Sequence, residues 1–318
     1  MVAGRTESWR YAVVFRTHIW DDYVARQYRR LAARIGSGDL FVLLDETNGP
    51  VPVSEGKVVS HTQEGIKALG LADAGRGNML WYNGDYPLYF FYHQYPDYDH
   101  YIMVEYDVAV HGDVDAMVAF TAREGIGFIG LTKGEPVAEW PFTATCLDAY
   151  APEDVRKRLF CFAVFSRDAV QALFEGRLSL SRELAEGTIQ RWPYCEAYIP
   201  TELALNGFKL AELSELGSTD LYDWRPAFVE TDLGRLQQHT FVHPVLDAHR
   251  YVQATIKGHW STWDALNPRS AFMRKLRRVP LSVYGAPLAA ALRARLAESA
   301  RMRLARAASL MVTRREAR

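Results

Sequence analysis

The sequence is poor in cysteine and contains no long apolar run. Cys146, Cys161 and Cys195 are widely spaced and form no CxxC pair, which disfavours a disulfide framework or a structural zinc site and favours a reducing compartment. No apolar stretch reaches the roughly 20 residues that a membrane-spanning helix requires. The start of the sequence also lacks the apolar core of a secretory signal. We therefore expect a cytoplasmic protein.

Several motifs of common enzyme classes are absent as well. The sequence contains no GxxxxGK[ST] phosphate-binding loop and no GxSxG nucleophile elbow. Gly125, Gly127 and Gly130 match GxGxxG, but they approach and enter the strand expected at residues 127–131 instead of joining a strand to a helix, so they lack the context of a dinucleotide fingerprint. Neither Cys161 nor Cys195 has an acid–base partner near it in the sequence, which argues against a cysteine nucleophile. These observations disfavour P-loop NTPases, Rossmann dehydrogenases and α/β-hydrolases.

The composition is that of an ordinary globular protein with an uneven distribution of charge. The 318 residues are 49% hydrophobic and 24% charged, enough for one large domain or two modest ones. The net charge is -1, yet the residues from Arg269 onward hold 13 Lys and Arg against two acidic residues. This basic end could lie on an anionic membrane surface, bind nucleic acid or pack as a solvated helix on another subunit. We expect the inner membrane face and no nucleic acid, because the acidic body opposes an extended phosphate track.

The order of the predicted elements indicates an α/β fold. Residues 11–16, residues 40–44 and Lys57–His61 are short apolar or β-branched runs that predict strands, the last of them at a sheet edge. A helical pattern over residues 21–34 separates the first two, which favours a parallel sheet with a right-handed crossover. Further strands are expected at residues 101–104, 127–131 and 160–165, and further helices at residues 83–95, 166–174 and 196–206.

The pattern changes beyond residue 260. Residues 260–268 are expected to form a loop, and the prolines at 280 and 287 are expected to break the chain. Residues 289–311 are rich in Ala, Leu and Arg and predict a helix. We therefore expect a domain over residues 8–258 and a basic helical C-terminal extension over residues 259–318.

Two carboxylates end the predicted central strand. Glu105 and Asp107 follow the apolar run at residues 101–104 and are separated by one residue. Ligand sites in open α/β sheets lie at the carboxyl ends of strands, where two acids repel each other unless a cation binds them. Carboxylate oxygens suit Mg²⁺ or Mn²⁺, which proteins usually share with substrate phosphates. The two acids therefore have two interpretations at this point, a metal–phosphate site or a solvated strand end.

This arrangement resembles the GT-A fold of nucleotide-sugar glycosyltransferases, especially the inverting family 2 type. The segment Leu43-Leu44-Asp45-Glu46-Thr47 stands where that family has an acid that contacts the nucleotide base, and Glu105-Tyr106-Asp107 is similar to its metal-binding DxD, as an ExD variant. The resemblance implies a GT-A-like (Rossmann-related), mostly parallel sheet flanked by helices. It also implies that Asp45 contacts the nucleotide and that Glu105 and Asp107 hold Mn²⁺ or Mg²⁺.

A second match lies on a predicted helix. Family 2 enzymes open a helix with a Glu-Asp pair, have a glycine about eleven residues after the second acid, and use that second acid as general base. Glu196 precedes Gly207 by eleven residues, while Cys195 replaces the first acid. The resemblance implies that Glu196 is the base. Glu202 is the backup candidate, with a surface residue inside the predicted helix as the alternative. A helix-capping glutamate is the alternative interpretation.

Other candidate residues follow from the same resemblance. Many GT-A enzymes bring a late histidine to the metal or the diphosphate, and His243 is the candidate here, with a histidine packed in a loop as the alternative. Thr17 and His18 end the first strand, where the family's first loop meets the nucleotide. They are candidates for contact with the base or ribose, with loop packing as the alternative. Asn83 follows two aromatic residues and is a candidate for the floor of the sugar site, with core packing as the alternative.

The sequence thus predicts a metal-dependent glycosyltransferase. It would move a sugar from a nucleotide-diphosphate donor to a hydroxyl of a saccharide or lipid-linked glycan, with inversion. One alternative is a catalytically silent GT-A-like binding or scaffold protein. Another is a nucleotidyltransferase, which a basic, glycine-rich first loop would favour; residues 16–20 contain no glycine.

Overall fold

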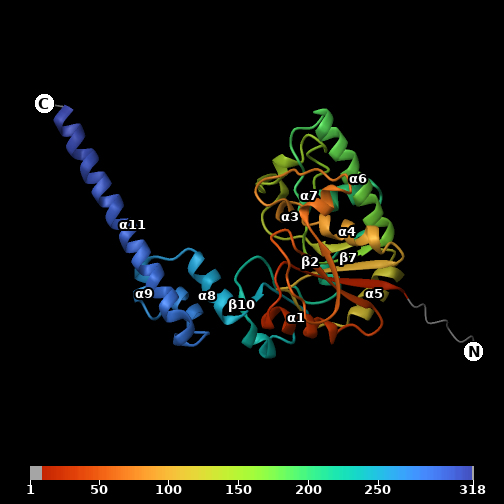
Figure 1. The fold of residues 1–318 in the computed structure, drawn as a ribbon, viewed down its shortest axis with the longest axis horizontal. Helices are drawn as coiled ribbons and strands as arrows, with labels where there is room; N and C mark the ends of the chain where they lie inside the picture. Colours follow the sequence, from red (N-terminus) through yellow and green to blue (C-terminus); the bar gives the residue numbers. More distant parts are fainter. Residues whose placement is uncertain (1–8, 317–318) are drawn as a thin grey trace, which may run out of the picture. The chain divides into compact units, whose positions relative to one another are not determined.

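The structure is a computed structural model that describes residues 9–316, and these form two compact units (Figure 1). The first unit contains the residues up to Asp223 together with Gln237–Val242. The second contains Trp224–Leu236 and the residues from His243 onward. The first unit carries two hydrophobic clusters, one on each face of its sheet, and the second carries a third.

A seven-stranded sheet forms the centre of the first unit. Its strands, in spatial order, are β3 (Lys57–His61), β2 (Asp39–Asp45), β1 (Tyr11–Thr17), β4 (His100–Glu105), β7 (Leu159–Ser166), β6 (Phe128–Leu131) and β8 (Leu210–Glu212). The pairs β1–β2, β2–β3, β1–β4 and β6–β8 are parallel, whereas β7 runs antiparallel to β4 and to β6. The predicted strands and the α/β class with a mostly parallel sheet are confirmed, and β3 lies at an edge as expected.

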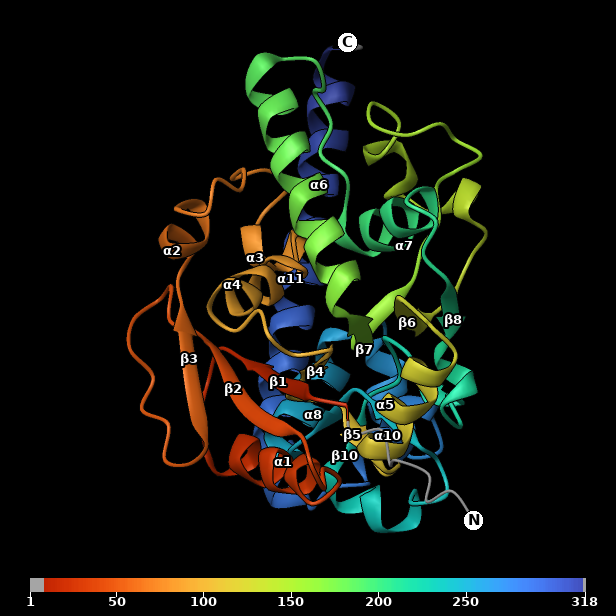
Figure 2. The same cartoon turned by 90° about the vertical axis from the view of Figure 1, so that its right-hand side faces the viewer.

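Helices cover both faces of this sheet, which explains the continuous apolar character of β1. On one face, Val13 and Phe15 belong to the cluster that contains residues of α1 (Asp22–Ala32) and α5 (Val114–Arg123). On the other face, Ala12 and Val14 belong to the cluster of α4 (Tyr86–Gln94), α6 (Arg167–Glu186) and α7 (Cys195–Leu205) (Figure 2). A strand buried on both faces cannot alternate polar and apolar residues.

Shorter elements complete this part of the chain. They are α2 (Gln63–Lys67), α3 (Met79–Tyr82), the 3-10 helices η1 (Val137–Glu139), η2 (Thr143–Thr145) and η3 (Leu213–Glu215), and the strands β5 (Ala109–Val110), β9 (Leu221–Tyr222) and β11 (Phe241–His243). The strands β5, β11 and β9 form a separate three-stranded sheet in that order.

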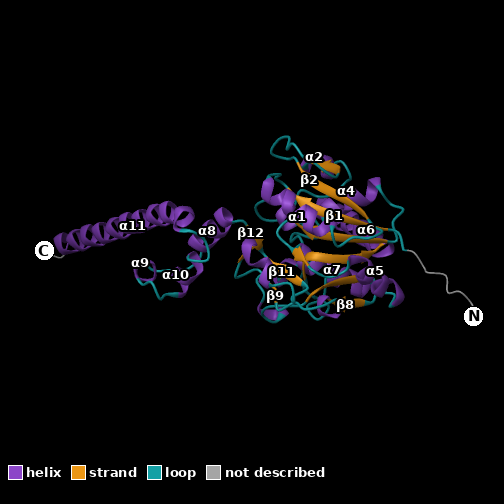
Figure 3. Ribbon diagram, turned by 90° about the horizontal axis from the view of Figure 1, so that it is seen from below, coloured by secondary structure: helices purple, strands orange, loops and turns teal. Residues whose placement is uncertain are grey.

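The second unit is mainly helical. Its elements are β10 (Phe228–Val229), η4 (Glu230–Arg235), β12 (Val245–Leu246), α8 (Ala248–Lys257), α9 (Thr262–Leu266), α10 (Ala271–Leu276) and α11 (Leu281–Glu316), with the helices drawn in purple in Figure 3. Tyr251 of α8 shares a hydrophobic core with Leu276 of α10 and Leu288 of α11. The expected domain boundary at residue 258 therefore falls inside this unit. No helix in the described part of the chain combines the length and apolar character needed to cross a membrane.

Two expectations about this second unit are wrong. Residues 260–268 are not a loop throughout, because Ser261 caps α9: its hydroxyl accepts from the Asp264 N–H, and the Asp264 carboxylate accepts from the Ser261 N–H. The proline-flanked segment does not break the chain either, since α11 continues through Pro287. This proline removes one backbone hydrogen bond near the helix start, and the strong helix formers that follow carry the helix on.

Candidate functional site

A cavity of about 330 Å³ lies at the carboxyl ends of β1, β2, β3 and β4. Its walls contain the last residue of each strand: Thr17 of β1, Asp45 of β2, His61 of β3 and Glu105 of β4. The complete lining is Arg16, Thr17, His18, Asp45, Asn48, His61, Asn78, Leu80, Trp81, Glu105, Tyr106 and Asp107. Five of the residues predicted from the sequence therefore share one cavity: Thr17, His18, Asp45, Glu105 and Asp107.

The strand order explains why a cavity forms here. The chain proceeds from β1 to β2 and β3 on one side of β1, whereas β4 lies on its other side. Segments that leave β1 and β4 therefore diverge, and ligands of open α/β sheets bind in the crevice outside the strand ends at such a switch point. The fold itself places the site between the ends of β1 and β4.

Arg16 is a cavity residue that the sequence analysis did not identify. It lies next to the end of β1, and its Nη2 and Nη1 atoms donate to the carbonyls of Leu80 at 2.8 Å and Gly84 at 3.0 Å. Its Nη1 also lies 3.4 Å from Oε1 of Glu105, which the parallel register places beside it. These carbonyls fix a cationic group within the wall that carries the acids. Its place in an apolar strand run, one residue before Thr17, was the signal available in the sequence.

The predicted nucleotide-side residues have different surroundings. The Asp45 carboxylate accepts from the backbone N–H of Thr47 at 2.9 Å, so the turn after β2 fixes its orientation. Thr17 is buried and its hydroxyl donates to the Ile19 carbonyl at 2.7 Å, which shapes the first loop. His18 is exposed and its ring packs edge-on against Tyr106 at 5.7 Å. Asp45 and His18 thus present polar groups to the cavity, whereas Thr17 mainly holds the loop.

Asn83 does not belong to the cavity. It is fully buried; its Nδ2 donates to the carbonyls of Ala74 and Met79, and its Oδ1 accepts from Nε1 of Trp192. All the polar capacity of this amide is used inside the fold. The assignment of Asn83 to the sugar site is therefore corrected to the core-packing alternative.

Glu196 lies in the first turn of α7, as predicted, and is buried. It is not part of the cavity lining. Burial, followed by the negative charge of Glu105, raises its pKa to about 8, while Lys157 acts in the opposite direction. The charge of the Glu105 carboxylate therefore acts on the ionisation of Glu196.

Cys161 also lies close to these acids. It lies in β7, beside the residue that pairs with Val104 of β4, so the antiparallel strand brings it to the end of β4. Burial, then the charges of Glu105, Asp107 and Glu196, raise the pKa of its thiol well above the usual value. The thiol is therefore protonated at neutral pH.

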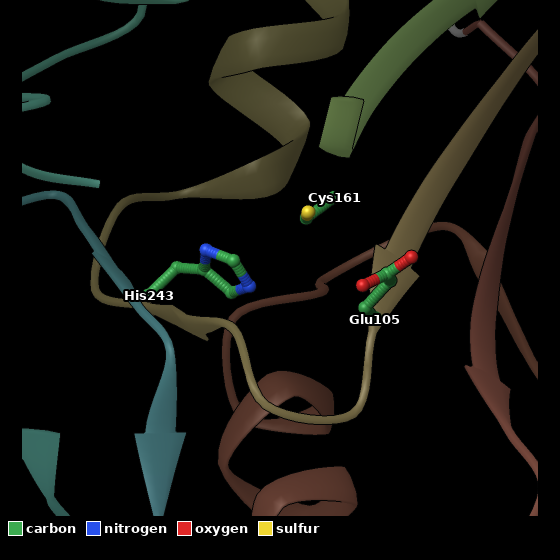
Figure 4. Close-up of side chains that lie close together, drawn as sticks. All are labelled: Glu105, Cys161 and His243. Atoms are coloured by element: carbon green, nitrogen blue, oxygen red, sulfur yellow. The ribbon is translucent and has the colours of Figure 1, made fainter. Parts of the chain in front are cut away.

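His243 is the last residue of β11, which pairs with β5 through Phe241 and Val242. Figure 4 shows its ring near the side chains of Glu105 and Cys161. One potential ligand atom of each of the three lies within 4.8 Å of the others. A carboxylate, an imidazole and a thiol are all ligands that metal ions use in proteins. Asp107 is not a member of this trio.

An aromatic wall lies beside the acids. Trp81 of α3 lines the cavity with 53% of its surface exposed, and its ring centre is 5.6 Å from that of Tyr194. Phe142, from the segment between β6 and β7, stacks on Tyr194 at 4.1 Å. Tyr194 is two residues before Glu196, so the aromatic wall and the buried carboxylate belong to adjoining segments.

His61 is a second cavity residue that the sequence analysis missed. Only 2% of its surface is exposed, and neither ring nitrogen has a hydrogen-bond partner among the described residues. Burial, assisted by Arg16 and opposed by Asp45, lowers its pKa to about 4. The neutral ring therefore offers one donor and one acceptor beside Asp45, with which His61 shares a register position of the β2–β3 pair.

No protein-family model matches the sequence, and no curated protein matches it.

Proposed function

We propose that the protein is a GT-A-like glycosyltransferase that moves a sugar from a nucleotide-diphosphate donor to a hydroxyl acceptor with inversion. The observation that supports this most directly is the meeting of Asp45, Glu105 and Asp107 around one cavity at the ends of parallel strands. Three acids in one wall are costly unless a ligand or cation compensates them. The predicted donor carries a diphosphate, which requires a cation for its own negative charge.

The donor side of the proposal uses the ends of β1, β2 and β3. The Asp45 carboxylate accepts hydrogen bonds from the nucleotide base. The two ring nitrogens of His61, which have no partner among the described residues, offer the nucleotide one donor and one acceptor. His18 borders the same space. These groups orient the nucleotide so that its diphosphate faces Arg16 and the acids of β4.

The donor atoms near Glu105 suit a divalent cation. Glu105 and Asp107 offer carboxylate oxygens and His243 offers an imidazole nitrogen, a set appropriate for Mn²⁺ or Mg²⁺. Cys161 is the less suitable member of the neighbouring trio for such hard ions, because burial and the nearby acids keep its thiol protonated. When bound, the cation supplies charge neutralisation for the leaving diphosphate. Arg16 adds a fixed positive charge in the same wall.

Glu196 completes the proposed reaction. The acceptor oxygen attacks the anomeric carbon, the bond from that carbon to the diphosphate oxygen breaks with its electron pair, and Glu196 takes the proton of the acceptor hydroxyl. A positioned base of this kind contributes roughly 10²–10⁴-fold to a rate. The exposed face of Trp81 provides a surface on which a saccharide acceptor can stack. We further propose peripheral association with an anionic membrane, which suits a lipid-linked acceptor.

Replacing Asp107 with alanine is expected to abolish metal-dependent donor binding, weakening it by roughly a hundredfold or more, because a cation ligand is lost. Thermal-shift titration with nucleotide-sugars, with and without Mn²⁺, measures this directly. The matched control is Asp97→Ala, an exposed aspartate outside the cavity, which should bind as the parent does. Equal donor affinity of Asp107→Ala and the parent would remove Asp107 from the site. Release of pyrophosphate rather than a nucleoside diphosphate would identify a nucleotidyltransferase instead.

Replacing His61 with leucine is expected to weaken nucleotide binding about tenfold, and to leave the ligand-free protein as stable as the parent or about 1 kcal/mol more stable. Removing a buried polar group that lacks a partner costs no hydrogen bond in the empty protein, whereas the ligand loses one. Calorimetric titration and urea unfolding measure the two effects separately. A variant that is clearly destabilised without any loss of affinity would show that His61 is a packing residue.

A further inference from the structure

The second unit exposes two large apolar side chains on α9. Trp263 is 73% exposed and Leu266 is 68% exposed. They are three residues apart and so lie on one face of the helix, while Ala265 packs against the hydrophobic core of the unit. The exposed pair is therefore the outward face of a helix whose other side is already held by the fold.

Basic side chains lie next to this pair. Phe272, Met273 and Leu276 of α10 are buried in the core, which leaves Arg274 and Lys275 on its outer side. Hydrogen bonds bring the guanidinium groups to the turn that follows Leu266. Arg274 Nη1 donates to the Arg269 carbonyl at 2.8 Å, and Arg277 Nη1 donates to the Pro268 carbonyl at 3.2 Å.

These six residues form a single surface, the α9–α10 patch: Trp263, Leu266, Arg269, Arg274, Lys275 and Arg277. Among the residues that the structure describes, none of its four cations forms an ion pair. The two nearby acids are already engaged, since Asp264 takes part in the α9 capping box and Asp232 lies 3.8 Å from Arg278. The patch therefore carries uncompensated positive charge beside exposed apolar surface.

We infer that the α9–α10 patch binds anionic lipid bilayers, with Trp263 and Leu266 in the interfacial layer and the four cations at the headgroups. Tryptophan is enriched at membrane–water interfaces, and stable peripheral binding needs an apolar contribution in addition to a basic one. Nucleic acid would use the cations but would leave Leu266 in water. The inference rests on the membrane association proposed above. It assigns the membrane contact to the α9–α10 patch instead of to the basic C-terminal part as a whole.

The test uses the full chain and sedimentation with vesicles, in the absence of donor and acceptor. We expect binding to phosphatidylcholine vesicles that contain phosphatidylglycerol, little binding to phosphatidylcholine alone, and weaker binding at high salt. Trp263→Ser with Leu266→Ser should weaken binding about tenfold or more. Replacing Arg274, Lys275 and Arg277 with glutamine should weaken it by roughly fivefold for each charge removed.

Matched controls remove exposed residues of the same kinds from the first unit. They are Leu147→Ser with Leu205→Ser, and the glutamine variants of Arg76, Arg123 and Arg182. These should bind vesicles as the parent does, and circular dichroism should show all variants folded. Parental binding by both patch variants overturns the inference. So does binding of mixed-sequence nucleic acid in preference to phosphatidylglycerol vesicles. Because no sugar transfer is measured, failure here is distinct from failure of the proposed reaction.

Discussion

Glu196→Gln is expected to lose sugar transfer by roughly 10²–10⁴-fold and, in the same protein, to gain stability at alkaline pH. Both effects come from one carboxyl group. Glutamine cannot accept the proton of the acceptor hydroxyl, so the rate falls. It also cannot ionise, so the cost of a buried negative charge near Glu105 disappears.

The sign of the stability effect follows from the raised pKa. The folded protein holds the Glu196 proton up to about pH 8, whereas an unfolded glutamate releases it near its ordinary value of 4.5. Below pH 4.5 the protonated Glu196 contributes its full stabilisation to the folded protein. This stabilisation is lost as the pH rises from 4.5 to about 8. At about 1.4 kcal/mol for each unit of pKa difference, the unfolding free energy falls by about 5 kcal/mol across the window. The free energy of unfolding of Glu196→Gln does not fall in this way, because glutamine does not ionise.

Urea unfolding at about pH 5 and about pH 9, without added metal, measures the difference. The parent and Glu196→Gln should differ most at the higher pH, where the variant is the more stable. Transfer by the parent should rise toward about pH 8, because only the carboxylate accepts a proton. Glu202→Gln is the control on the same helix; Glu202 accepts from the Tyr150 hydroxyl at 2.8 Å, and the variant should retain transfer. Parallel pH profiles of stability for Glu196→Gln and the parent would refute the assignment.

Arg177→Met is expected to destabilise the protein by about 3–5 kcal/mol. Arg177 and Asp85 are both buried, with Nε 2.8 Å from Oδ2, and Asp85 also accepts from the Tyr89 hydroxyl at 2.9 Å. Methionine preserves much of the volume but leaves the Asp85 charge without its cation in the core. The guanidinium also lies over the Tyr198 ring at 3.8 Å, an attraction that methionine does not replace.

Unfolding by urea tests this prediction with a double variant as the control. Arg177→Met with Asp85→Leu removes both charges and should recover much of the lost stability, because no uncompensated charge remains. A double variant no more stable than the single one would locate the cost in packing instead. The pair also matters for the site. Arg177 donates to the Pro193 carbonyl at 3.0 Å, close to Glu196, and Asp85 follows Gly84, whose carbonyl holds Arg16.

The strands were predictable because their sequences are apolar on both faces. Residues 11–16, 40–44 and 101–104 read as strands without any tertiary information, and Asp45, Glu105 and Asp107 then fall at one edge of the sheet by topology alone. Arg16 and His61 were not identified, although Arg16 is a charged residue within an apolar strand run. A polar residue at the end of a strand gives no sign of whether its side chain turns toward the ligand or toward solvent.

Other features depend on contacts that lie far apart in the sequence. The Oδ1 of Asn83 accepts from Trp192, more than a hundred residues away, and this contact cannot be seen in the sequence around Asn83. The division between the two units also escaped prediction, because α8 joins the core of the later helices through Tyr251. The start of α9 is different, because Ser261 and Asp264 have the spacing of a capping box in the sequence itself.

The reversed direction of β7 brings a later part of the chain to the edge of the sheet at which the cavity lies. The strands β1 to β4 contribute the residues at which they leave the sheet, whereas β7 brings to the same edge the residues at which it enters. The segment at 132–158 that leads into β7 supplies Phe142, next to Tyr194 and Trp81. This segment is separate in sequence from the turn that fixes Asp45, and it contacts Trp81 through Phe142. Under the proposed function, substitutions in this segment would alter the choice of acceptor while the turn that orients Asp45 toward the donor stays the same.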